Sequence, residues 1–253
     1  MTNRCDEYIE PMLRDWIEGL KAAAPGQCAV CRSWPAQPVC EACVVRFAQP
    51  QPRCFTCALP VPEGVDRCGR CLREPAPLDH CLAAVSYGYP WSGLVTRFKF
   101  HGQPGWAGPL AALMRSAPWV EPALEDADLV LPMPLSPERL AERGFNQALE
   151  LARALAPGKV RPGLLLRVRN TPAQAELGLA ARLLNVRGAF AIEPLQATQL
   201  RGRRLVLVDD VMTSGASVYA AARTLREAGA AHITAIVLAR TDEPEPVAPP
   251  SPQ

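Results

Sequence analysis

The sequence predicts an α/β protein, with a parallel sheet covered by helices and preceded by a small zinc-ribbon domain. Two observations carry this prediction. After residue 77, apolar strand-like runs alternate with helix-like patterns, which is typical of a parallel sheet with helices on both faces. Before it, four C-x2-C pairs lie in a segment with little apolar periodicity, and such a segment needs a metal or a cross-link to hold a fold.

These patterns divide the 253 residues into four expected parts. Residues 1–25 hold an N-terminal amphipathic helix, because apolar side chains recur there at helical spacing. Residues 26–77 form a double zinc ribbon, and residues 78–242 form the α/β domain. Residues 243–253 are rich in proline and acidic residues, so a disordered tail is expected.

Strands and helices of the α/β domain are assigned from periodicity. Six short apolar runs predict strands at 82–87, 128–132, 164–168, 188–192, 204–208 and 232–238. Helical spacing predicts helices at 91–100, 105–116, 144–156, 177–184 and 216–228.

The compartment follows from what the sequence lacks. The first residues, MTNRCDEYIE, carry charges throughout and do not resemble a secretory leader. No run approaches the roughly 20 apolar residues of a membrane span. We therefore expect a cytoplasmic protein with no membrane span, in which thiols stay reduced.

The cysteine pairs predict metal binding. Each pair offers two thiolates on a tight turn, and two pairs complete the four corners of a closed zinc site. Disulfides and a redox or iron–sulfur role are the alternatives. We expect neighbouring pairs to share a metal, with interleaved pairing as the rival. The predicted ligands are Cys28, Cys31, Cys40, Cys43, Cys54, Cys57, Cys68 and Cys71.

A second motif, VLVDDVMTSGAS at 206–217, joins an apolar run to two aspartates and a loop of small residues. A Walker B role would need a G-x-x-x-x-G-K-[ST] loop, which the sequence lacks; simple capping of the next helix remains an alternative. The arrangement also suits a sugar phosphate. Asp209 and Asp210 would accept hydrogen bonds from vicinal ribose hydroxyls, and a helix N-terminus would bind the phosphate. The candidate binding residues are Asp209, Asp210, Val211, Met212, Thr213, Ser214, Gly215, Ala216 and Ser217.

This stretch resembles the 5-phosphoribosyl-1-pyrophosphate (PRPP) motif of type I phosphoribosyltransferases. Three further stretches accompany it, YGYPWSGLVTRFKFHG (87–102), LPMPLSPERLAERGFNQALELARAL (131–155) and RVRNTPAQAELGLAARLLNVRGAF (167–190). Together with the cysteine pairs they resemble the ComF family of competence-associated, phosphoribosyltransferase-like proteins, over about residues 28–240. The resemblance implies a type I phosphoribosyltransferase fold, PRPP with Mg²⁺ as ligand, and Asp209 and Asp210 as catalytic residues.

The remaining site residues follow from charge and from the resemblance. Residues 139–204 contain twelve Arg or Lys against four Glu and no Asp, a balance that suits phosphates. Arg139 and Arg143 are candidates for pyrophosphate contact, and Lys99 for reaching the ligand, although each also fits an exposed helix face. In related transferases a loop closes over PRPP. Here that hood is expected at about 167–178, with Arg169, Thr171, Gln174 and, in the following helix, Arg182 as candidates.

Two classes of function stay open at this point. The first is a transferase that moves ribose 5-phosphate from PRPP to a base or amine. The second is a non-catalytic, single-stranded-DNA-binding accessory factor in which PRPP is a regulatory ligand. The ComF resemblance implies a role in natural transformation or the use of imported DNA, so single-stranded DNA and the DNA-uptake machinery are candidate partners. The sequence does not identify the acceptor.

Overall fold

The computed structural model describes residues 26–169 and 188–242. The chain divides into two compact units, Met1–Phe47 and Ala48–Gln253. The described part of the first unit contains helix α2 (Glu41–Phe47) and an antiparallel bridge between Gly26 and Ala36. The expected N-terminal helix and Pro-rich tail lie outside the described residues. The expected division into four parts therefore stays a prediction.

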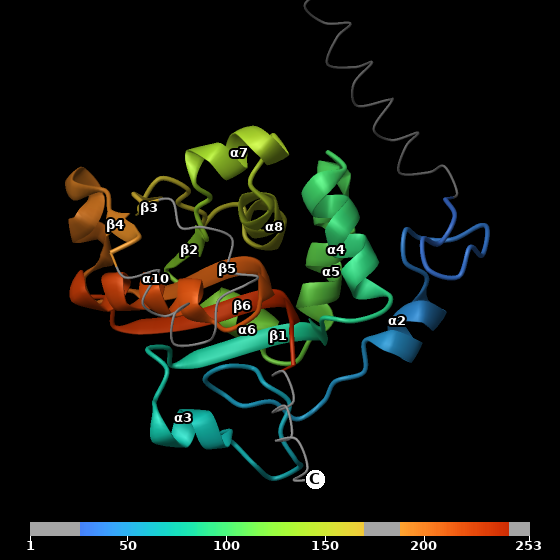
Figure 1. The fold of residues 1–253 in the computed structure, drawn as a ribbon, viewed down its shortest axis with the longest axis horizontal. Helices are drawn as coiled ribbons and strands as arrows, with labels where there is room; N and C mark the ends of the chain where they lie inside the picture. The colour runs from blue at the N-terminus through green and yellow to red at the C-terminus, as the bar shows by residue number, and fades with distance from the viewer. Residues whose placement is uncertain (1–25, 170–187, 243–253) are drawn as a thin grey trace, which may run out of the picture. The chain divides into compact units, whose positions relative to one another are not determined.

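A four-stranded parallel sheet forms the centre of the second unit (Figure 1). Its strand order is β1-β6-β5-β2, so the chain crosses over between neighbours. The strands are β1 (His80–Ser86), β2 (Leu129–Pro132), β5 (Arg204–Met212) and β6 (His232–Arg240). Because all four are parallel, their carboxyl ends meet at one edge, which is where open α/β sheets bind ligands.

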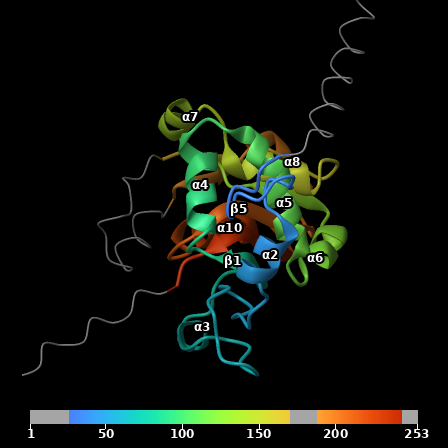
Figure 2. The same cartoon turned by 90° about the vertical axis from the view of Figure 1, so that its right-hand side faces the viewer.

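Helices cover both faces of this sheet. One face packs against α5 (Ala107–Ser116) and α8 (Gln147–Leu155), which also contact each other (Figure 2). The opposite face packs against α10 (Ala216–Glu227) and shares a hydrophobic core with Cys54, Cys57 and Cys71. Alternating side chains of β5 serve the two faces, which explains its unbroken apolar run. The predicted parallel α/β architecture is confirmed.

Two predicted strands do not join the central sheet. β3 (Leu165–Arg167) and β4 (Phe190–Ile192) pair with each other, antiparallel, in a separate two-stranded sheet. Periodicity identifies a strand but carries no information about its partner, so the expectation of one parallel sheet was wrong for this pair. The predicted helix at 177–184 lies outside the described residues.

The remaining elements are short. α4 (Trp91–Phe100) matches its predicted range, and the predicted helix at 105–116 is a 3-10 turn, η1 (Pro104–Trp106), followed by α5. The sequence patterns did not indicate α2, α3 (Gly69–Arg73), α6 (Val120–Asp126), α7 (Pro137–Arg143) or the 3-10 helix η3 (Pro194–Leu200). Each of these five has seven or fewer residues, which is too short for a helical period to emerge.

Among the described residues, no helix combines the length and the apolar character required to cross a bilayer.

Candidate functional site: an acidic pair, a phosphate-type loop and two cysteine clusters

A cavity of about 170 Å³ opens at the carboxyl edge of the sheet. It is lined by residues from β5, α7, the start of α8 and the start of α10. The structure brings most of the predicted ligand-binding residues to this one place, namely Lys99, Arg139, Arg143, Asp209, Asp210, Val211, Met212, Thr213, Gly215, Ala216 and Ser217.

The two aspartates belong to strand β5, which continues four residues beyond its predicted end at 208. The strand persists because its pairing with β6 continues as far as Met212, opposite Arg240. Asp210 is buried and forms an ion pair with Lys99, with Nζ and Oδ1 2.8 Å apart. Asp209 is only partly buried and faces the cavity. A helix on one side of the site thus supplies the cation for an acidic residue on the sheet.

Burial, and then the neighbouring Asp210 carboxylate, raises the pKa of Asp209 to about 7. An aspartate in an unfolded chain ionises near pH 3.9, so between these values the folded protein binds more protons than the unfolded one. We therefore expect Asp209 to make the free energy of unfolding fall as pH rises from about 4 to 7. Urea unfolding at several pH values checks this. The Asp209→Asn variant should lose that part of the slope, and an identical slope in both proteins would contradict the assignment.

The loop of residues 213–217, here called the phosphate-type loop, follows β5 and brings backbone close to the cavity. Gly215 begins α10 in the left-handed conformation, with φ of 81°. A Cβ there would lie 2.6 Å from Met212 Cε and 2.7 Å from Tyr219 Cζ, so only glycine fits. Residues at the start of α10, together with Thr213 and Ser217, line one wall of the cavity. The backbone N–H groups in the first turn of a helix have no acceptor within the helix. Such a wall attracts anions.

Ser214 is the member of the predicted set that lies elsewhere. It is buried, its Oγ lies 3.4 Å from the backbone N of Ala216, and it lines a different, smaller cavity beside Arg70 and Tyr219. Its hydroxyl therefore supports the loop from a side that does not line the ligand cavity.

Helix α7 explains how two arginines reach the cavity. Ser136 begins the helix, since its Oγ accepts from the backbone N–H of Arg139 at 3.4 Å, and Pro137 follows. Arg139 and Arg143 are four residues apart and so lie on one helix face. Arg143 donates to Gln147 Oε1 at 2.9 Å and stacks over the Phe100 ring at 5.2 Å.

Eight residues that line the cavity were not among the named candidates, and three of these carry polar side chains: Arg167, at the start of the expected hood range, Asn146 and Gln147. Asn146 caps α8, with its Oδ1 3.3 Å from the backbone N of Leu149, and its Nδ2 donates to the Met133 carbonyl at 3.0 Å. Arg167 ends β3 and lies over the Phe190 ring; burial, and then the charge of Arg139, lowers its pKa. The sequence did contain a signal for Arg167, because this arginine lies near the end of a predicted strand within the basic stretch 139–204.

The expected hood residues fall into two groups. Arg169 is exposed and is not among the residues that line the cavity. Thr171, Gln174 and Arg182 lie outside the described residues. The hood assignment stays a prediction.

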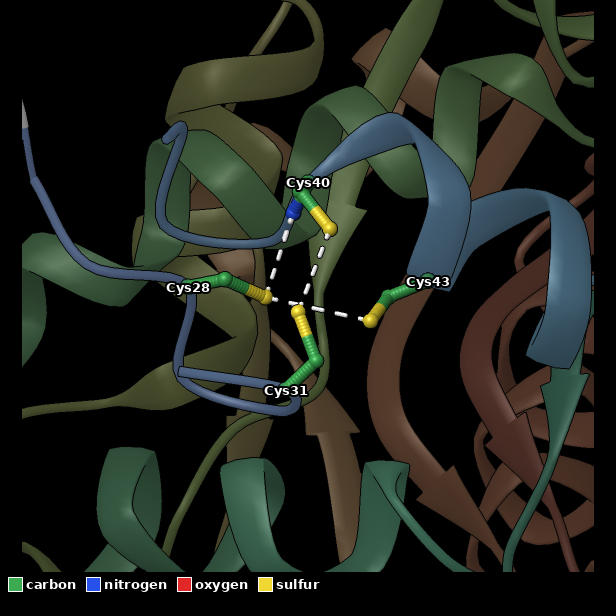
Figure 3. Close-up of side chains that lie close together, drawn as sticks. All are labelled: Cys28, Cys31, Cys40 and Cys43. Atoms are coloured by element: carbon green, nitrogen blue, oxygen red, sulfur yellow. Dashed lines mark hydrogen bonds between the residues drawn. The ribbon is translucent and has the colours of Figure 1, made fainter. Parts of the chain in front are cut away.

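Cys28, Cys31, Cys40 and Cys43 converge in the first unit (Figure 3). Cys28 and Cys31 come from a tight turn, and Cys40 and Cys43 from the start of α2. The Sγ atoms of Cys28 and Cys43 are 3.9 Å apart, and those of Cys31 and Cys40 are 3.6 Å apart. Four sulfurs around zinc at about 2.3 Å would be about 3.8 Å apart, so this donor set fits the ion.

The second cluster, Cys54, Cys57, Cys68 and Cys71, has the same arrangement. The Sγ atoms of Cys57 and Cys68 are 3.6 Å apart. Burial opposes ionisation of Cys54, but backbone hydrogen bonding from Cys68 and other donors lowers its pKa to about 6, which favours the thiolate that a metal binds. Neighbouring pairs share a cluster, as expected, and the interleaved pairing is excluded.

The two clusters differ in their surroundings, and this leads to a prediction about zinc. We expect two zinc ions per chain by mass spectrometry of the metal content. Cys28→Ser with Cys31→Ser should remove one ion and leave the second unit stable. Cys68→Ser with Cys71→Ser should also remove one, but lower that unit's free energy of unfolding by more than about 3 kcal/mol, because the second cluster belongs to its core. Equal effects of the two variants in denaturant unfolding would contradict this.

Comparisons with known proteins agree with this architecture. A family model described as "Phosphoribosyl transferase domain" matches residues 140–251. The DNA utilization protein YhgH of Salmonella typhimurium is 33% identical over 227 residues, which cover 86% of this chain and 98% of that protein. Competence protein F of Haemophilus influenzae is 33% identical over 181 residues, covering 68% and 78%. Competence protein ComFC of Bacillus subtilis is 34% identical over 149 residues, 58% of each chain.

These matches reach almost the whole length of YhgH and include the region that holds the acidic pair, the loop and the arginines. The chain therefore belongs to the ComF family and contains a phosphoribosyltransferase domain.

Proposed function

We propose that the cavity binds PRPP together with Mg²⁺. The observation that carries the proposal is the convergence of two carboxylates, a glycine-started helix N-terminus and several arginines on one cavity. Asp209 and Asp210 would accept hydrogen bonds from the ribose hydroxyls. The loop from Thr213 to Ser217 would enclose the 5-phosphate with its backbone N–H groups.

The arginines of the cavity would bind the pyrophosphate end of PRPP. Arg139, Arg143 and Arg167 add positive charge to the cavity wall facing the loop, where a pyrophosphate would be stabilised as it leaves. Mg²⁺ prefers carboxylate and phosphate oxygens, so Asp209, Asp210 and the pyrophosphate are the groups that would hold it. The ion would supply further positive charge to the leaving group.

Transfer of the phosphoribosyl group to a base or amine is the reaction that this arrangement supports. Departure of pyrophosphate leaves a sugar with oxocarbenium character, which nearby carboxylates stabilise. In this role Asp209 and Asp210 act through their charge, and Lys99 positions Asp210. The hood residues Arg169, Thr171, Gln174 and Arg182 would exclude water from the reacting sugar.

The relatives' names support a role in the handling of DNA. YhgH is named a DNA utilization protein, and Competence protein F is named for competence. We infer a role in DNA uptake or in the use of imported DNA, with the uptake machinery as a partner.

A second candidate function, binding of single-stranded DNA, is favoured by exposed aromatic residues at both clusters. Trp34 is 68% exposed and Phe55 is 48% exposed, and Arg32 and Arg46 add positive charge in the first unit. Exposed rings of this kind stack on bases. In that case PRPP would be a regulatory ligand.

The test is pyrophosphate release from PRPP and Mg²⁺, with and without a mixture of nucleobases. Base-dependent release, lost in the Asp209→Asn, Asp210→Asn variant, supports a transferase. PRPP binding without release by any base favours the regulatory function. For that function, binding of a labelled oligonucleotide should weaken steeply with salt and with Trp34→Ala plus Phe55→Ala. A protein that neither releases pyrophosphate nor binds PRPP contradicts the proposal.

A further inference from the structure

Arg240 lies at the carboxyl end of β6, outside the acidic pair. Its side chain is only 1% exposed, and it is the largest of the fully buried side chains in the described residues. None of the ion pairs that join described residues includes it. A guanidinium buried without a carboxylate is costly, so the backbone carbonyls that accept hydrogen bonds from Arg240 must stay in place to compensate its charge.

The hydrogen bonds of Arg240 connect two distant parts of the chain. Nε donates to the backbone carbonyl of Cys57 at 2.8 Å, in the second cysteine cluster. Nη1 donates toward the carbonyl of Met212, at 3.1 Å, and that of Thr213. Met212 ends β5 and Thr213 begins the loop that leads to Gly215. One planar group therefore fixes a metal-binding turn and the start of the phosphate-type loop relative to each other.

Other contacts join the same two regions. Cys81 Sγ lies 3.6 Å from Met212 Sδ, and Arg70, inside the second cluster, approaches the Tyr219 hydroxyl at 3.4 Å. Met212 and Tyr219 are the side chains that press against Gly215. The side chains that pack against the phosphate-type loop are therefore in contact with Arg70 of the second cluster and with the nearby Cys81.

Zinc in the second cluster would add negative charge beside one of these carbonyls, that of Cys57. Four thiolates around one Zn²⁺ carry a formal charge of −2, the sum of +2 and four times −1. The metal-loaded cluster would place this charge beside the turn that Arg240 contacts. Zinc would also hold the turn from Cys54 to Cys57 in place, and without it the Cys57 carbonyl would no longer be fixed within hydrogen-bonding reach of Arg240 Nε.

We propose that Arg240 is a positioning residue that couples metal occupancy of the second cysteine cluster to the shape of the phosphate-type loop. Loaded with zinc, the cluster holds Arg240 and the loop is set to receive the 5-phosphate of PRPP. Stripped of zinc, the cluster releases Arg240 and the loop loses the support of two carbonyl contacts. This inference rests on the proposed PRPP site for its ligand end, and on the cysteine cluster alone for its metal end.

The coupling works in both directions, because linkage between two binding sites is reciprocal. Zinc in the second cluster should tighten PRPP binding. PRPP should in turn raise the zinc affinity of that cluster by the same factor, and we expect the higher affinity to appear as slower loss of zinc. The first cluster belongs to the other unit, so we expect it to show neither effect.

The experiment uses the full chain carrying Cys28→Ser and Cys31→Ser, so that only the second cluster binds zinc. Into it we place Arg240→Gln, which removes the charge, and Arg240→Lys, which keeps the charge but removes the planar fork. Calorimetry measures the PRPP–Mg²⁺ dissociation constant. A chromogenic zinc chelator measures the rate of zinc loss, with and without PRPP. Circular dichroism checks that each variant is folded.

We expect both substitutions to weaken PRPP binding by about tenfold or more and to speed zinc loss. PRPP should slow zinc loss in the Arg240 protein and not in the variants. Cys68→Ser with Cys71→Ser should weaken PRPP binding, whereas Cys28→Ser with Cys31→Ser should leave it unchanged. If Arg240→Gln does not fold, Arg240→Lys and the cysteine variants still decide the question.

A folded variant with unchanged PRPP affinity and unchanged zinc loss overturns the coupling. If the protein with Arg240 intact binds no PRPP, the proposed function fails, but the rates of zinc loss still report on the metal end. Zinc loss that is the same with and without the Arg240 substitution would then overturn that part as well.

Discussion

Asp209→Asn combined with Asp210→Asn is expected to weaken PRPP–Mg²⁺ binding by at least about 100-fold. In the proposed complex each carboxylate accepts a ribose hydroxyl, and a hydrogen bond to a charged group contributes about 1.5–3 kcal/mol. Two such contacts amount to about 3–6 kcal/mol, which is more than a factor of 100 in affinity. Calorimetric titration of the two proteins with PRPP and Mg²⁺ measures the effect.

Two aspartates near the start of β5, at the end opposite to Asp209 and Asp210, provide a matched control. Asp126 and Asp128 pair with Arg204 and Arg203, and their replacement by asparagine changes the net charge by the same amount, away from the cavity. That variant should bind PRPP as the unmodified protein does. Equal losses in both variants would show a general effect of charge, and full affinity in the Asp209, Asp210 variant would remove the carboxylates from the site.

Gly215→Ala is expected to destabilise the second unit and to abolish measurable PRPP binding. Two penalties act at this position. A left-handed conformation costs a residue with a Cβ about 1–2 kcal/mol, and the added Cβ would also lie less than 3 Å from Met212 and Tyr219. To relieve the contact the loop must move, and its N–H groups would then no longer point at the phosphate. Urea unfolding and PRPP titration measure the two consequences.

Gly202→Ala separates these penalties. Gly202 also has a positive φ, 69°, but no atom lies within 4 Å of a Cβ added there. It should show the conformational cost alone and bind PRPP normally. The excess loss of stability in Gly215→Ala then measures the close approach behind the loop. A Gly215→Ala variant that is no less stable than Gly202→Ala would indicate that the loop is not tightly packed.

The central sheet and the acidic loop were predictable because local patterns encode them. β5 and β6 are apolar runs that the sheet buries on both faces, and α10 follows with clear helical spacing. The spacing of the four C-x2-C pairs is sufficient to identify these cysteines as candidate metal ligands. In each case the residues that form the feature are neighbours in the chain, so the chemistry is visible before the fold is known.

The features that escaped prediction depend on contacts between distant residues. The Lys99–Asp210 ion pair joins α4 to β5. Arg240 donates a hydrogen bond to Cys57, which lies 183 residues earlier in the sequence. The pairing of β3 with β4 is likewise a long-range choice. In the sequence, Arg240 is one arginine after an apolar run, with no pattern to distinguish it from an exposed residue at a strand end.

The most direct test of the PRPP site is a set of three titrations of the unmodified protein in the presence of Mg²⁺, with PRPP, ribose 5-phosphate and pyrophosphate. The acidic pair and loop should bind the sugar phosphate, and the arginines should bind pyrophosphate. PRPP, which occupies both halves, should therefore bind more tightly than either fragment and be displaced by each. Failure of the zinc-loaded, folded protein to bind PRPP, or PRPP binding no tighter than pyrophosphate alone, would contradict this assignment of the cavity.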